Sequence, residues 1–175
     1  MTHPPPIIPD DKDWTGVIED GCLQCDWQPP QAVAVARRIR ATVPLWRAAL
    51  AQPDANARPD SSTWSTLEYG CHSRDVCRLF GQRVSQMLTQ DNPTFANWDQ
   101  DETAINDRYW EQEPRLVAEE YAEAAEHLAG LFDSVQAEQW QRQGTRSNGS
   151  EFTVATLAVY CLHDLDHHLH DIAGP

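Results

Sequence analysis

The sequence predicts an all-α protein, an antiparallel four-helix bundle preceded by an irregular N-terminal segment. Three observations predict this class. Four long segments carry apolar residues at helical spacing, polar clusters rich in Pro, Asn, Asp and Gly separate them, and no region alternates apolar and polar residues long enough to make a convincing strand. Core-facing helices joined by polar connections are typical of a bundle.

Each of the four helices has its own evidence. The first is expected at 31–51, where Pro44 should bend it or split it in two. The second begins near Thr63, a suitable capping residue, and continues to about Thr89. The fourth is expected at 151–172. The third has the clearest apolar stripe, in steps of four and three residues: Val117, Tyr121, Ala124, Leu128, Leu131 and Val135.

The remaining segments are expected to be irregular. Residues 1–30 contain six prolines, which block regular structure, so the bundle domain is placed at 31–175. The connection 90–113 is expected to cross one end of the bundle and to carry a short helix. RQGTRSNGSE (142–151) reads as a polar loop.

Composition excludes several classes of partner. The chain of 175 residues has 27 acidic and 13 basic side chains, a formal net charge of −14. Affinity for nucleic acids and for anionic lipids comes mainly from Lys and Arg, so neither partner is expected. No apolar run is long enough to span a membrane, and the start of the chain lacks the features of a signal peptide, so we expect a cytoplasmic protein.

The five cysteines are an odd number, which argues against a secreted disulfide framework. Cys22 and Cys25 form a CxxC, which can be half of a zinc site or a redox pair. Cys71, Cys77 and Cys161 lie far away and singly, and no βαβ context follows. The favoured interpretation is therefore a turn with two packed thiols.

Residues 163–170 read HDLDHHLH, with four of the seven histidines of the chain. On a helical wheel Asp164 and His168 fall on the core face or its shoulder, one turn apart. His163, His167 and His170 fall on the far side. His163 and His167 also have i,i+4 spacing and form an alternate metal pair, which points the wrong way unless the helix is rotated.

Asp164 and His168 can approach one metal ion from the same side, as paired histidines do in HExxH motifs. His72, the only histidine of the second helix, is the expected third ligand. Three protein ligands leave one position for water or substrate, which is the catalytic pattern. Each residue also has a structural interpretation: His72 as a hydrogen-bonded core residue, Asp164 as an ion-pair partner of Arg83, and His170 as a solvated helix end. Asp171 and Glu68 are candidates for orienting a ligand without touching the metal, and Glu68 is also a candidate base.

Two stretches resemble a known family. WSTLEYGCHSRDV (64–76) and VATLAVYCLHDLDHHLHDI (154–172) are similar to motifs of the DinB-like superfamily of four-helix-bundle metalloproteins. That superfamily includes bacterial thiol S-transferases and mycothiol-dependent maleylpyruvate isomerases. The resemblance covers roughly 30–172, so the CxxC lies outside the usual core.

The resemblance implies specific ligands. A histidine eight residues after the tryptophan that starts the second helix is a ligand in the family; here these residues are Trp64 and His72. Alignment of the last helix places the other ligands at Asp164 and His168, with Asp where the family commonly has His and the isomerase branch has Glu. The family also implies zinc or nickel, and its bundles are often homodimers.

The preferred function is a metal-dependent enzyme that acts on a small-molecule substrate, with thiol S-transferase or thiol-dependent isomerase chemistry and a low-molecular-weight thiol as cosubstrate. A divalent ion lowers the pKa of a bound water or thiol. The alternative is a non-catalytic metal- or ligand-binding or sensing bundle. No catalytic residue is assigned. WDQDE (98–102) can add carboxylates to the site but reads more readily as a solvated turn, and Arg146 is a weak candidate for holding an anionic substrate.

Overall fold

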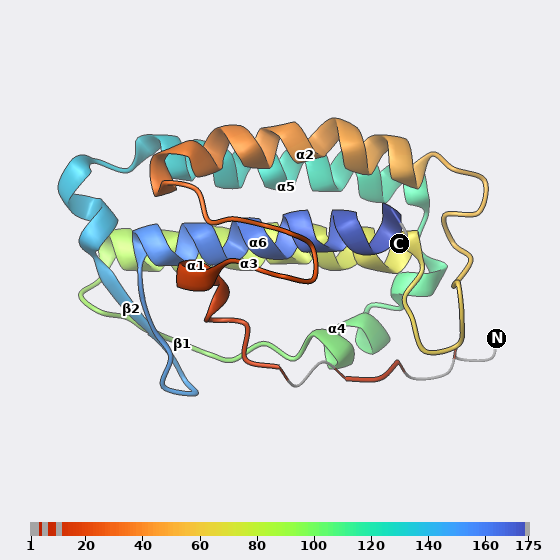
Figure 1. Cartoon of the computed structure of the whole chain (residues 1–175), viewed down its shortest axis with the longest axis horizontal. Helices are drawn as coiled ribbons and strands as arrows, with labels where there is room; N and C mark the ends of the chain where they lie inside the picture. The colour runs from red at the N-terminus through yellow and green to blue at the C-terminus, as the bar shows by residue number, and fades with distance from the viewer. Residues whose placement is uncertain (1–3, 5–6, 10–11, 174–175) are drawn as a thin grey trace.

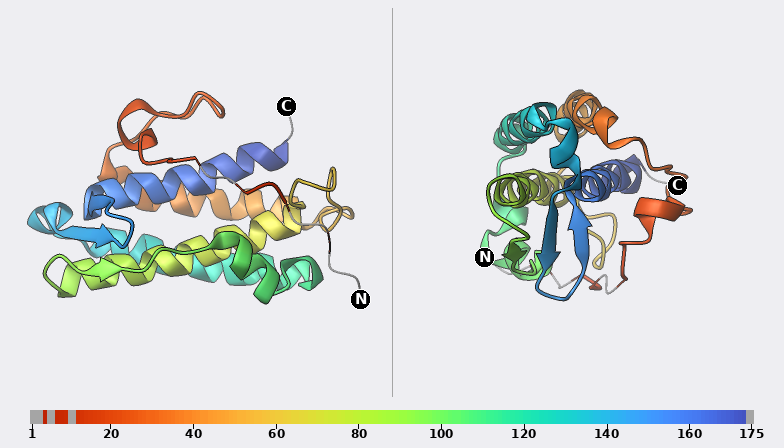
Figure 2. Two further views of the ribbon diagram at one scale, coloured as in Figure 1. Left: turned by 90° about the horizontal axis from the view of Figure 1, so that it is seen from below. Right: turned by 90° about the vertical axis from the view of Figure 1, so that its left-hand side faces the viewer.

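Four long helices run side by side along the length of the molecule (Figure 1). In this computed structural model, which describes residues 4, 7–9 and 12–173, they are α2 (Val35–Leu50), α3 (Thr66–Thr89), α5 (Pro114–Ser134) and α6 (Val154–Ala173). The predicted four-helix bundle is confirmed. The end-on view in Figure 2 shows the four helices around one core.

The directions of the helices add a feature that the sequence did not predict. α3 and α5 run in the same direction, and α2 and α6 run in the opposite one (Figure 1). The cause is the connection 90–113, which returns along the length of the bundle instead of crossing one end. It carries the short helix α4 (Gln100–Asn106) and a 3₁₀ turn, η2 (Tyr109–Glu111).

The start of α3 differs by two residues from the expected one. Ser65, not Thr63, is the N-cap: it has extended backbone angles, and its hydroxyl accepts a hydrogen bond from the backbone N–H of Glu68. The Glu68 carboxylate in turn accepts from the Ser65 backbone N–H, which completes a capping box. The Thr63 hydroxyl donates instead to Asp60.

The other helices lie close to their expected ranges. A 3₁₀ turn, η1 (Ala32–Ala34), leads into α2, and Pro44 lies inside α2 without splitting it. A further 3₁₀ turn, η3 (Ala137–Gln141), follows α5. None of the helices among the described residues has the length and hydropathy needed to cross a membrane.

A small sheet occupies one end of the bundle, where the sequence predicted loops and, from residue 151, the start of the last helix. β1 (Thr94–Phe95) pairs in parallel with β2 (Gln143–Arg146), and β2 pairs antiparallel with β3 (Glu151–Thr153). The expectation of no strands was wrong because strands this short cannot display alternation. The turn between β2 and β3 lies within the predicted polar loop, and β3 leads directly into α6.

The N-terminal segment lies along α6 on the outside of the bundle (Figures 1 and 2). It contains the short helix α1 (Val17–Asp20) and a turn in which the backbones of Cys22 and Trp27 exchange two hydrogen bonds. The Trp27 indole N–H donates to Asp166 of α6, which also pairs with Arg38. These contacts fix the segment to the last helix.

Candidate metal centre

The structure brings the three predicted ligands together. His72 comes from α3, and Asp164 and His168 come from adjacent turns of α6. Their ligand atoms all lie within 4.8 Å of one another. Oδ1 of Asp164 is 3.3 Å from Nε2 of His72 and 3.6 Å from Nε2 of His168. The three side chains therefore converge on a single point.

Aromatic rings hold the two imidazoles. His72 is fully buried and stacks on Trp98, with ring centroids 5.3 Å apart. Trp64 lies against the same imidazole, at 5.4 Å, and Tyr69 packs on His168, at 4.9 Å. These contacts restrict the ring orientations before any ligand binds, which reduces the entropy lost on binding.

The polar atoms at the centre of the group lack ordinary hydrogen bonds. Among the residues that the structure describes, neither ring nitrogen of His72 nor Oδ1 of Asp164 has a partner in hydrogen-bonding geometry, although all three atoms are buried. Buried polar atoms without a partner are costly. A divalent cation would satisfy Nε2 of His72 and Oδ1 of Asp164 together, so this donor set fits a metal.

The electrostatics favour the protonation states that metal binding requires. Complete burial lowers the pKa of His72, although Asp164 opposes the shift. Burial by itself would raise the pKa of Asp164, but the close contact with His72 and the nearby His168 outweigh it and bring the pKa to about 2. At neutral pH the group therefore offers a neutral imidazole and a carboxylate, as a metal site needs.

The two residues predicted to orient the ligands differ in their contacts. Oδ2 of Asp171 lies 2.8 Å from Nδ1 of His168, which leaves Nε2 of that ring directed at Asp164. The Glu68 carboxylate instead binds Arg58 and caps α3 at Ser65. Its hydrogen bonds thus serve the helix start and not an imidazole.

A pocket of about 840 Å³ lies beside the three ligands. Asp164 and His168 line it, together with the N-terminal segment around Trp14 and the 98–102 stretch. Asp99 of this stretch also accepts a hydrogen bond from Glu102 N–H at the start of α4, so the stretch is both a helix cap and a pocket wall. Arg83 donates to the Ala96 carbonyl and is not the partner of Asp164.

The alternate pair has neighbours that the sequence did not predict. His163 and His167 face away from His72, as the wheel predicted, but the N-terminal segment covers them, and His163 is only 3% exposed. Sγ of Cys25 is 3.9 Å from Nε2 of His163, and Sγ of Cys22 is 3.9 Å from Nδ1 of His167. The CxxC and the alternate pair, considered separately in the sequence, are neighbours.

The Cys25 thiol and the His163 imidazole are uncharged in this environment. Burial, with smaller contributions from Cys22, raises the pKa of the Cys25 thiol to about 11. Burial also lowers the pKa of His163 to about 4, with a further decrease from the neighbouring His167. The raised pKa keeps the Cys25 thiol protonated at neutral pH, so this thiol is a poor nucleophile in the metal-free protein.

Comparison with known proteins identifies the family. The family model of the DinB superfamily matches residues 24–172, which include all three converging ligands. The chain belongs to the DinB superfamily. No curated protein matches it. The chain is also similar in fold to the solved structure of YfiT from Bacillus subtilis, which is described as "a probable metal-dependent hydrolase with an unusual four-helix bundle topology". The two share 13% identity with a TM-score of 0.71, over 81% of this chain and 85% of YfiT.

Proposed function

We propose that this protein is a metal-dependent enzyme that acts on a small molecule, with a divalent ion held by His72, Asp164 and His168. One observation carries the proposal: three ligand atoms from two helices lie within 4.8 Å of one another beside a pocket of about 840 Å³. Pockets of a few hundred to about 1,000 Å³ are typical of small-molecule sites.

The composition of the site supports a catalytic rather than a purely structural ion. Two imidazoles and one carboxylate leave one position of a four-coordinate ion for a water or a substrate atom. Zinc fits this nitrogen and oxygen set, and nickel is the second choice. When bound, such an ion supplies Lewis-acid activation of a water or a thiol near neutral pH.

Neighbouring residues position the metal ligands and leave two of them accessible from the pocket. Trp64 and Trp98 hold the His72 imidazole, and Asp171 orients the His168 ring. Burial of the His72 side of the group excludes bulk water there, and Asp164 and His168 line the pocket, from which a substrate can reach them. Asp164 reduces the net charge of the group by one, which favours the binding of a dication.

We further propose thiol S-transferase or thiol-dependent isomerase chemistry, as the resemblance to those branches of the superfamily implies. The pocket is large enough for an electrophile and a small thiol side by side. YfiT, described as a probable metal-dependent hydrolase, shares the fold. The same ligands can activate water, so the assay must separate transfer to a thiol from hydrolysis.

The charge of the pocket restricts the substrate. Among the described lining residues, Lys12 and Arg146 are the only basic side chains besides histidines. The Arg146 guanidinium donates hydrogen bonds to the side chains of Asn148 and Ser150. A neutral or cationic substrate is therefore favoured over an anionic one. The carboxylates of the lining are Asp13, Asp99, Asp101, Glu102, Asp164 and Asp171.

Metal analysis combined with turnover tests the proposal. We expect His72→Ala and His168→Ala to lose about one equivalent of divalent ion relative to the wild type, and His127→Ala, an exposed histidine of α5, to lose none. Retention of all metal by both ligand variants would refute the site.

Turnover then separates the functions. The metal-loaded wild type is incubated with small electrophiles, with and without low-molecular-weight thiols, and products are identified by mass spectrometry. Thiol adducts or thiol-dependent isomers that need metal and His72 support the proposal. Hydrolysis without thiol would assign hydrolase chemistry, and no metal-dependent product with bound metal would favour the binding or sensing alternative.

A further inference from the structure

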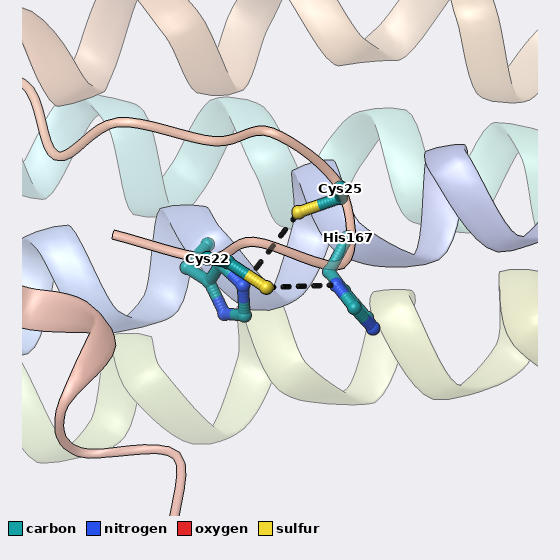
Figure 3. Close-up of side chains that lie close together, drawn as sticks. Cys22, Cys25 and His167 are labelled. Carbon is teal, nitrogen blue, oxygen red and sulfur yellow. Dashed lines mark hydrogen bonds between the residues drawn. The ribbon is translucent and has the colours of Figure 1, made fainter. Parts of the chain in front are cut away.

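A second group of side chains that can bind a metal lies on the neighbouring face of α6, about 100° around the helix from the first. Cys22 and Cys25 come from one turn of the N-terminal segment, and His163 and His167 come from successive turns of α6. The four ligand atoms all lie within 4.8 Å of one another. Figure 3 shows both thiols on the turn, directed at α6, with Cys22 joined to His167.

We infer that Cys22, Cys25, His163 and His167 form a closed Cys₂His₂ zinc site that fixes the N-terminal segment to the bundle. The inference does not rest on the proposed function, because the two groups share no ligand.

The distances fit a tetrahedral zinc ion. With bonds of about 2.3 Å to sulfur and about 2.0–2.1 Å to nitrogen, tetrahedral angles hold a sulfur and a nitrogen ligand about 3.6 Å apart. Both sulfur–nitrogen distances in the structure are 3.9 Å. Movements of a few tenths of an ångström bring these two distances, which are also within reach of thiol–imidazole hydrogen bonds, to the values of a zinc site.

The spacing of the ligands matches structural zinc sites. Two residues separate the cysteines, and three separate the histidines, so each pair can approach an ion from one side. Four protein ligands leave no position for a substrate, which distinguishes this site from the first. Sulfur and imidazole together favour zinc over hard cations such as Mg²⁺ or Ca²⁺.

The turn is shaped to present both thiols. The backbones of Cys22 and Trp27 exchange hydrogen bonds of 2.9 and 3.0 Å, which close the turn around Cys25. Gly21 has a φ of +74°, and a Cβ there would lie 2.5 Å from the Trp27 carbonyl oxygen, so the turn requires glycine at this position. Asp26 also has a positive φ, of 50°.

Aromatic rings pack against both histidines of the group. Trp14 lies 5.4 Å from the His163 ring and 4.9 Å from the His167 ring, and Trp27 packs edge-on against His163 at 5.1 Å. Cys22 is only 4% exposed. Trp14 and Trp27 thus cover part of the group, while His163 and His167 also line the pocket.

The site also connects to the pocket. Trp14, together with the adjacent Lys12 and Asp13, lines the pocket beside the first ligand group. A zinc ion at the Cys₂His₂ group would therefore hold one wall of that pocket in place.

Cobalt substitution tests the inference, because thiolate ligands give Co²⁺ a ligand-to-metal charge-transfer band in the near ultraviolet and tetrahedral geometry gives intense visible bands. The His72→Ala protein, which keeps all four ligands of the second group, is expected to bind about one equivalent of Co²⁺ with both features. The double variant Cys22→Ser/Cys25→Ser on the same background should lack them. Cys77→Ala, which removes a buried cysteine elsewhere, should retain them.

A second measurement does not depend on whether the double variant folds. Treatment of the zinc-loaded His72→Ala protein with an organomercurial should release about one equivalent of zinc to a colorimetric indicator. Absence of the thiolate band in His72→Ala, absence of mercurial-released zinc, or a Cys22–Cys25 disulfide in the freshly purified protein would overturn the inference. Loss of metal from the first group alone would leave it intact.

Discussion

Asp171 contacts one histidine from each ligand group, so its removal should weaken metal binding at both proposed sites. Its Oδ2 lies 2.8 Å from Nδ1 of His168, and its Oδ1 lies 3.7 Å from Nε2 of His167. In both rings the other nitrogen faces the metal ligands, Asp164 in one case and Cys22 in the other. A carboxylate in this position fixes the ring orientation and makes the ligating nitrogen more basic.

The distances set the expected magnitudes. Loss of such a partner costs roughly 10- to 100-fold in metal affinity, or about 1.4–2.7 kcal/mol. The His168 contact has hydrogen-bond length, so Asp171→Ala should approach the upper limit at the first group. The 3.7 Å contact to His167 is longer than a hydrogen bond, so the effect at the Cys₂His₂ group should be near the lower limit.

Separate backgrounds allow each affinity to be measured. In the Cys22→Ser/Cys25→Ser background, competition with a chelating indicator measures the metal affinity of the first group. The same titration in the His72→Ala background measures the metal affinity of the second group. Glu123→Gln, an exposed carboxylate of α5, is the matched control and should change neither affinity. Unchanged affinity at both groups in Asp171→Ala, or a larger loss at the Cys₂His₂ group, would refute the reasoning.

Three further predictions concern stability. Ser65→Ala removes the capping box of α3 and should cost about 1 kcal/mol, measured by chemical denaturation; an unchanged midpoint would contradict the role of this cap. Gly144→Ala places a Cβ 2.8 Å from Met87 Cγ and should cost about 1–3 kcal/mol, whereas Gly130→Ala, with open space, should not destabilise the protein. In metal-free protein the pKa of His163 falls from 6.5 to about 4, so between these values the unfolded chain binds a proton that the folded chain does not. The free energy of unfolding should therefore be higher by about 3 kcal/mol at pH about 6.5 than at pH about 4 because of this residue. Chemical denaturation at both pH values measures the difference, and it should be correspondingly smaller in His163→Gln.

The bundle and the first ligand group follow from patterns that are local in sequence. Apolar residues repeat at helical spacing because one face of each helix is buried, and Asp164 and His168 share a face because they are one turn apart. That His72 meets them depends on how α3 packs on α6, which periodicity does not encode. His72 was expected there as the only histidine of the second helix, and the resemblance to the family pointed to the same residue.

Other features depend on contacts between distant segments. The shared direction of α3 and α5 is set by the path of 90–113, and no hydrophobic pattern specifies whether a loop crosses an end or returns along the bundle. The strands at 143–146 and 151–153 are too short for alternation. Each is stabilised by its neighbours in the sheet and not by its own sequence.

The octapeptide HDLDHHLH shows what a helical wheel can and cannot predict. Residues 163 and 167 share one face, and 164 and 168 share the next, about 100° away. The wheel therefore separates two i,i+4 pairs correctly, but it does not indicate what covers each face. Here the second face is covered by residues 138 and 145 positions earlier in the chain, Cys25 and Cys22. One short segment of α6 thus supplies ligands to two different groups, because consecutive residues of a helix point in different directions and the chain covers both faces.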